Sequence, residues 1–69
     1  MSKTFLRMAQ VEERTGLSRW TIRRAVRDGT FPAPVRLSAN SVGWLESELE
    51  RWAARRVAER DDRAKAAAH

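Results

Sequence analysis

The clearest alternation of hydrophobic and polar positions in the chain lies between Ser18 and Gly29. At about 100° per residue, a helix over this stretch places Ile22, Ala25 and Val26 on one side. The opposite side carries four arginines and one tryptophan, namely Arg19, Trp20, Arg23, Arg24 and Arg27. Ser18 suits an N-cap, because its hydroxyl accepts a hydrogen bond from a free first-turn N–H, and Gly29 suits a C-cap. We therefore predict a short helix with one apolar side and one strongly basic side.

A second helix is predicted just before this one, from about Met8 to Thr15. Met8 and Val11 stand three residues apart and share its apolar face, and Gly16 follows as a C-cap. The link to the next helix is so short that the two helices must cross sharply and pack. This is the layout of a helix-turn-helix, whose second helix enters the major groove of DNA. The same spacing also fits a plain corner between two helices of a small helical protein.

The pattern then changes to that of a hairpin. Two prolines exclude a helix from residues 30–37. Val35 and Leu37 alternate with Arg36, which predicts a strand with both apolar side chains inward and the arginine outward. After a short turn, residues 42–44 form the returning strand. We expect this hairpin to be a wing that either contacts DNA, with Arg36 as its best candidate, or only covers the core.

The last part of the chain predicts one long helix, from about Leu45 to at least Arg60. Its first turn is acidic, which suits the positive end of the helix dipole. Leu49 and Trp52 share a face with Leu45 and are expected to close the core. Arg56 continues this stripe, and we expect its stem to lie over Trp52 with its charge in water.

These elements predict a mainly α fold with a small β-hairpin, a winged helix-turn-helix of three helices plus a wing. Residues 1–60 form the DNA-binding domain. Residues 61–69, a tail rich in alanine and charge, either extend the last helix, fray or order on a partner. Near the N-terminus, Phe5 and Leu6 are expected to be extended and to fold back on the core.

Composition agrees with a basic domain. Sixty-nine residues allow one small domain with a modest core. The net charge of +5 is unevenly placed, because residues 1–45 hold eight Lys/Arg and three Asp/Glu whereas residues 46–69 hold six of each. The first two-thirds of the chain thus carries the whole imbalance, which favours double-stranded DNA as a partner.

The side chains that catalysis needs are scarce. The chain has no cysteine, and its one histidine is His69, at the end of the chain. No serine has a histidine base that a fixed structure would hold near it, and no Gly-rich phosphate loop is present. The carboxylate clusters fall on helix surfaces and in a helix first turn. We expect no enzymatic activity, no catalytic residues, no metal and no cofactor.

No apolar run approaches the ~20 residues that a membrane-spanning helix needs. The first residues also lack the long apolar stretch of a signal peptide. We therefore expect a cytoplasmic protein with no membrane partner.

The candidate binding residues lie on the basic side of the central helix. Four arginines on one face repel one another, so a partner's counter-charge would explain them, although a solvated charged face is the alternative. Arginine grips phosphates and the guanine edge bidentately. The expected DNA-binding residues are Ser18, Arg19, Trp20, Arg23, Arg24, Arg27 and Arg36. Trp20 either stacks on a sugar or base, packs against another protomer or folds back over its own helix.

The chain resembles the AlpA-type prophage regulators, which are akin to excisionases and to the DNA-binding domain of MerR regulators. The resemblance covers about residues 6–60. Its motifs are Thr15-Gly16-Leu17-Ser18-Arg19, Thr21-Ile22, Arg24, Asp28-Gly29, Phe31-Pro32, Pro34-Val35-Arg36-Leu37 and Val42-Gly43-Trp44-x-Glu46-Ser47-Glu48-Leu49-x-x-Trp52. The resemblance implies a winged helix-turn-helix that binds DNA, with its recognition positions on the residues named above in the central helix. Many members have a small residue where Trp20 stands and a tyrosine where Arg23 stands, so the resemblance implies DNA binding but not which DNA sequence is read.

The resemblance also implies a role in a mobile genetic element. One hypothesis is an excisionase, or recombination directionality factor, which binds repeats at an attachment site, cooperatively and head to tail, bends the DNA and steers a tyrosine integrase toward excision. A second is a transcription activator or repressor of integrase or excision genes. A third, from another class, is a protein-interaction adaptor that reuses the fold.

Overall fold

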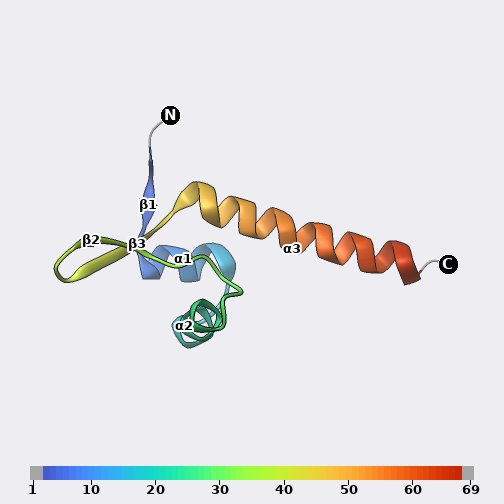
Figure 1. Cartoon of the computed structure of the whole chain (residues 1–69), viewed down its shortest axis with the longest axis horizontal. Helices are drawn as coiled ribbons and strands as arrows, with labels where there is room; N and C mark the ends of the chain where they lie inside the picture. The colour runs from blue at the N-terminus through green and yellow to red at the C-terminus, as the bar shows by residue number, and fades with distance from the viewer. Residues whose placement is uncertain (1–2, 68–69) are drawn as a thin grey trace.

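The computed structural model describes residues 3–67, which form three helices and three short strands (Figure 1). In chain order the elements are β1 (Phe5–Leu6), α1 (Met8–Thr15), α2 (Arg19–Asp28), β2 (Val35–Ser38), β3 (Ser41–Leu45) and α3 (Glu46–Ala67). The hairpin of β2 and β3 projects at one end of the molecule, and α3 runs out at the other end. This mainly helical arrangement, with a small sheet, agrees with the predicted fold class.

The two predicted helices of the helix-turn-helix are confirmed, and so are their ends. Gly16 and Gly29 both adopt the left-handed conformation, with φ of 74° and 79°, immediately after α1 and α2. The turn is closed by Thr15, whose hydroxyl donates to the Val11 carbonyl at 2.8 Å and accepts from the Leu17 N–H at 3.2 Å. This hydroxyl bridge holds the chain between α1 and α2, so that both helices pack on one core.

The core is formed by one contiguous group of side chains drawn from β1, β3, the three helices and the loop after α2. Its buried members are Leu6, Val11, Ile22, Phe31, Trp44 and Leu49. The residues packed around them include Met8, Leu17, Ala25, Val26 and Trp52. The predicted apolar sides of α1 and α2 are therefore both confirmed as the sides that face the core.

Two tryptophans tie the loop between α2 and β2 to this core. The Trp44 indole N–H donates to the Pro32 carbonyl at 2.8 Å, and the Trp52 indole N–H donates to the Thr30 carbonyl at 3.0 Å. The rings of Phe31 and Trp52 also meet edge to face, with centroids 4.7 Å apart. The carbonyls of Thr30 and Pro32, which lie in a loop and not in a strand, thus accept hydrogen bonds from side chains.

The sheet has three antiparallel strands in the order β1-β3-β2. Strand β1 pairs Phe5 with Leu45 and Leu6 with Trp44, which brings the start of the chain against the middle of it. The sequence predicted only an extended segment here, because two apolar residues are too few to show a periodicity. Leu6 is buried as expected, whereas Phe5 lies on the other face of the sheet.

The predicted facing of β2 is wrong, and the register explains why. Val35 pairs with Gly43, and Arg36 pairs with Val42. Since side chains alternate along a strand, Val42 and its partner Arg36 stand on the face that carries the buried Trp44. Val35 and Leu37 instead lie on the outer face and are 37% and 40% exposed. Leu37 covers Gly43 there, so closely that a Cβ on Gly43 would stand 2.9 Å from the Leu37 Cδ1.

Helix α3 begins at Glu46, one residue later than predicted, because Leu45 is the last residue of β3. Glu46 and Glu48 form the expected acidic first turn, and Glu46 also pairs with Arg14 at 2.7 Å. The guanidinium of Arg56 lies over the Trp52 ring at 5.8 Å, as expected.

The C-terminal tail continues α3 without a break as far as Ala67, so the alternative of a helical extension is the one observed. Every described residue from 53 onward is exposed. His69 lies outside the described residues.

The fully buried position of Ile22 gives a stability prediction. Ile22→Val removes one methylene from a packed core and is expected to lower the free energy of unfolding by about 1 kcal/mol. The milder substitution is chosen because so small a domain has only a few kcal/mol to lose. The control is Val57→Ala on exposed α3, which is expected to stay within about 0.5 kcal/mol of the parent. Urea unfolding measures both, and equal effects at the two positions would contradict the core as described.

Candidate nucleic-acid interface

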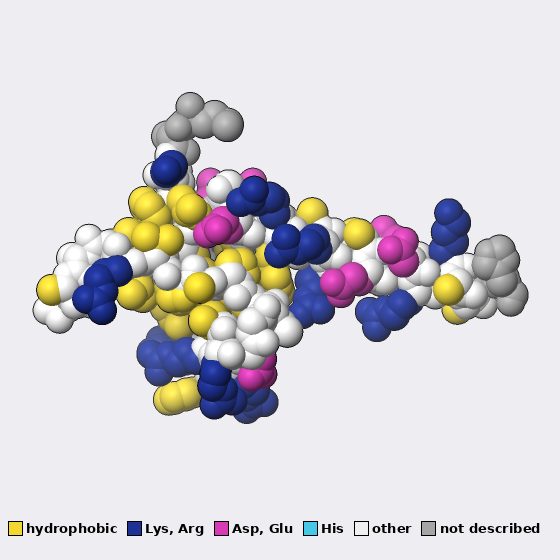
Figure 2. Space-filling view, viewed as in Figure 1, with side chains coloured by type: hydrophobic (Ala, Val, Ile, Leu, Met, Phe, Trp, Pro, Cys, Tyr) yellow, Lys and Arg dark blue, Asp and Glu magenta, His cyan; other side chains and the backbone are white. Residues whose placement is uncertain are grey.

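The basic side of α2 is an exposed surface. The five side chains predicted to point away from the core are all exposed, namely Arg19, Trp20, Arg23, Arg24 and Arg27. Figure 2 shows Lys and Arg side chains gathered around α2 at the bottom of the view, whereas basic and acidic side chains alternate along α3. Within α2, Asp28 at the last turn is the one acidic residue. The surface is therefore a concentrated positive patch, which we call the α2 basic face.

The arginines of the α2 basic face have different neighbours. The Arg27 guanidinium lies 3.7 Å from the Asp28 carboxylate, and both side chains are largely exposed. Arg19 contacts Glu12 of α1. Among residues 3–67, neither Arg23 nor Arg24 has an ion pair with an acidic side chain. Arg23 and Arg24 are thus the arginines of this face that are free to neutralise the charge of a partner.

Trp20 lies among these arginines and is 68% exposed. The guanidinium of Arg23, one turn further along α2, stands 5.5 Å from the ring centroid, which is a cation–π distance. The Trp20 ring thus contacts a residue of its own helix, which agrees with the alternative in which Trp20 folds back over α2. The remaining ring surface is open to solvent, so the contacts with DNA or with another protomer stay predictions.

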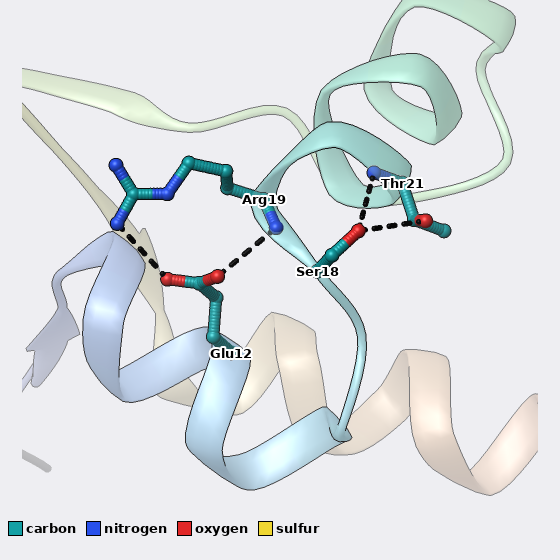
Figure 3. A network of polar contacts seen from close by, with 4 residues as sticks. All are labelled: Glu12, Ser18, Arg19 and Thr21. Carbon is teal, nitrogen blue, oxygen red and sulfur yellow. Dashed lines mark hydrogen bonds and ion pairs between the residues drawn. The ribbon is translucent and has the colours of Figure 1, made fainter.

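Ser18 performs the capping role that its position predicted. Its Oγ accepts from the Thr21 N–H at 3.3 Å and lies 3.0 Å from the Thr21 hydroxyl (Figure 3). Capping satisfies a first-turn donor that has no intrahelical acceptor. The Ser18 side chain is therefore already engaged in holding the start of α2.

A contact that the sequence did not predict joins α1 to the same end of α2. The Glu12 carboxylate accepts from the Arg19 backbone N–H at 3.0 Å and from the Arg19 guanidinium at 3.4 Å (Figure 3). The two residues are seven positions apart on different helices, so no helical periodicity relates them. Only the angle of the turn brings them together.

Arg36 is brought to the same side of the molecule as α2 by the register of the hairpin. It stands opposite Val42, and Val42 and Trp44 line a groove of about 240 Å³ whose other wall includes Arg23 and Val26 of α2. The predicted outward position of Arg36 was wrong, yet the arginine is exposed, because the hairpin projects beyond the helices. The register thus places Arg36 on the sheet face that carries Val42 and Trp44, while the basic side chain that lines the groove itself is Arg23.

No group of three or more His, Cys, Asp or Glu side chains is arranged to hold a metal ion among residues 3–67. In the same residues, no helix has both the length and the apolar character that crossing a membrane requires.

A short helix–turn–helix unit with an exposed arginine face, followed by a small hairpin, defines a basic domain of the helix-turn-helix kind. The comparison with protein families agrees with this class: residues 4–57 match the family described as prophage CP4-57 regulatory protein (AlpA). The chain belongs to this AlpA family of prophage regulators, a family that is not enzymatic in general. The resemblance to the AlpA-type prophage regulators is thereby confirmed.

Two relatives show how far the similarity extends. The chain is 46% identical over 56 residues to the uncharacterized protein ORF88 of Enterobacteria phage P4, covering 81% of this chain and 64% of that protein. It is 37% identical over 57 residues to the DNA-binding transcriptional activator AlpA of Escherichia coli K12, covering 74% of this chain and 81% of that protein. The chain thus spans less than two thirds of the length of the phage P4 relative. No solved structure matches the chain.

The different environments of the tryptophans predict different costs of substitution. Trp44→Phe removes the indole donor to the Pro32 carbonyl and part of the core volume, and is expected to cost at least about 1 kcal/mol of unfolding free energy. Trp20→Phe is expected to change it by less than about 0.5 kcal/mol, because the ring is largely exposed. Thermal melts of the two variants provide the comparison. A large loss at Trp20 would show that this residue serves folding rather than the surface.

Proposed function

We propose that this chain is a sequence-specific DNA-binding regulator of a mobile genetic element. The observation that carries the proposal is the α2 basic face, which is exposed on the second helix of a helix-turn-helix. Like charges on one face destabilise an isolated helix. Arg23 and Arg24 have no acidic partner among residues 3–67, so their stabilising counter-charge is best supplied from outside. Membership of the AlpA family supports the same conclusion.

In this proposal α2 lies in the major groove, as the second helix of a helix-turn-helix does. Arg23 and Arg24, which have no acidic partner among residues 3–67, supply base and phosphate contacts from the middle of the helix. Arg27 adds a contact near the end of α2. The hairpin acts as the wing, with Arg36 directed at the backbone of the same duplex.

The regulatory role is proposed first as transcription control, since the Escherichia coli relative is named a DNA-binding transcriptional activator. The excisionase role is the second candidate, because it needs the same surface. In that role the chain would bind repeats at an attachment site, associate head to tail with further copies and direct a tyrosine integrase. One small domain buries little DNA surface, which favours cooperative binding in either role.

DNA binding itself is tested with Arg23→Ala/Arg24→Ala in one protein. We expect wild-type affinity for duplex DNA to fall steeply with salt, log K dropping by about 0.9 per phosphate contact for each decade. The double variant is expected to lose most of this affinity and to show a shallower slope. The matched control, Arg60→Ala/Arg63→Ala on exposed α3, removes the same charge away from the α2 basic face. Fluorescence anisotropy across a salt series provides the measurement, and an equal loss in both double variants would contradict α2 as the DNA-contacting element.

The two regulatory roles are separated by footprinting across the element's attachment site and promoters. A compact footprint at a promoter is expected for the transcription regulator. Protection that spreads over phased repeats beside the attachment site would identify the excisionase instead. Absence of any footprint would favour the adaptor that reuses the fold.

A further inference from the structure

We infer that Glu12 limits sequence-independent DNA binding by occupying the anion-binding end of α2 and holding Arg19. This inference rests on the proposed function and adds a specificity-determining residue to it. Glu12 belongs to α1, outside the α2 basic face, and no sequence pattern marks it as part of the site. Its role follows from the two contacts in Figure 3.

The first contact fills a place that suits a phosphate. The exposed N–H groups and the dipole at a helix N-terminus attract anions. Here the Arg19 N–H, at the first residue of α2, already donates to the Glu12 carboxylate at 3.0 Å. Because Ser18 accepts from the Thr21 N–H in the same turn, two first-turn donors are satisfied from within the protein. A DNA phosphate approaching the Arg19 N–H meets the negative charge of Glu12 in place of a free donor.

The second contact directs the Arg19 side chain toward α1. Its guanidinium lies 3.4 Å from a carboxylate oxygen of Glu12, and the two side chains are 51% and 27% exposed. An arginine paired in this way neutralises a protein carboxylate, so it releases fewer counterions from DNA than an unpaired arginine would. Arg23 and Arg24, further along α2, are not affected by Glu12 and remain available to DNA bases.

Glu12 is therefore expected to affect sequence-independent affinity for DNA differently from discrimination between DNA sequences. Phosphate contacts supply binding to any sequence, whereas base contacts discriminate between sequences. Glu12 lowers the affinity that comes from phosphate contacts and leaves the discrimination by base contacts unchanged. A purely structural Glu12, which only joins α1 to α2, would stabilise the fold without altering the dependence of binding on salt.

Glu12→Gln separates these possibilities, because the amide oxygen can still accept from the Arg19 N–H while the charge is lost. The matched control is Glu13→Gln, which makes the same charge change at the next residue of α1, an exposed position. Arg19→Ala and Glu12→Gln/Arg19→Ala complete a double-mutant cycle. Each protein binds a random-sequence duplex at 50–200 mM salt, and a thermal melt checks that it is folded.

We expect Glu12→Gln to steepen the salt slope by about 0.9, the value for one added phosphate contact, and to tighten binding at low salt by up to roughly tenfold. Glu13→Gln is expected to give a clearly smaller change. Most of the gain should vanish when Arg19→Ala is also present.

Equal slopes for Glu12→Gln and Glu13→Gln, with wild-type binding intact, would overturn this inference and leave the proposed function standing. Weaker binding together with a lower melting temperature in Glu12→Gln would assign Glu12 a structural role only, and would also overturn it. Failure of the wild-type protein to bind any duplex would overturn the proposed function, and this inference with it.

Discussion

The burial of the apolar side of α2 is the constraint on which the rest of the structure depends. Ile22 is fully buried in the common core, with Ala25 and Val26 packed beside it. At about 100° per residue, fixing that side leaves the arginines no orientation except outward. The caps at Ser18 and Gly29 then set the length of the helix, so the extent of the basic face is determined by its ends.

The turn before α2 passes this constraint on to α1. Gly16 in its left-handed conformation and the Thr15 hydroxyl bridge fix how the chain reverses between the helices. That reversal puts Glu12 against the first residue of α2, where its carboxylate satisfies a donor and counters one arginine. A carboxylate here stabilises the start of the helix and also reduces its attraction for phosphates. In our inference, the same side chain therefore favours folding and disfavours non-specific binding.

The helices could be predicted from the sequence because their signals are local. Apolar spacing, an N-cap serine and two C-cap glycines lie within the elements that they define, and they gave α1 and α2 their observed bounds. The hairpin shows what local signals leave out. The alternation of Val35, Arg36 and Leu37 identifies a strand but not which of its faces meets the core. That choice is made by β3, where Trp44 occupies the helix side and Gly43 leaves room for Leu37 on the outer side. Strand β1 and the pairing of Glu12 with Arg19 could not be predicted from the sequence either. Each depends on residues that only the tertiary structure brings together.

The register of the hairpin also changes the shape of the candidate interface. Arg36 lies on the sheet face that carries Val42 and Trp44, and these two residues line a groove together with Arg23 of α2. The apolar residues displaced by this register, Val35 and Leu37, lie on the far face of the sheet, away from that groove. In the proposed complex, with α2 in the major groove, Arg36 is the hairpin side chain assigned to the backbone of the same duplex. The alternation that leaves Val35 and Leu37 exposed on the outer face of the sheet thus also places Arg36 on the face that carries Trp44.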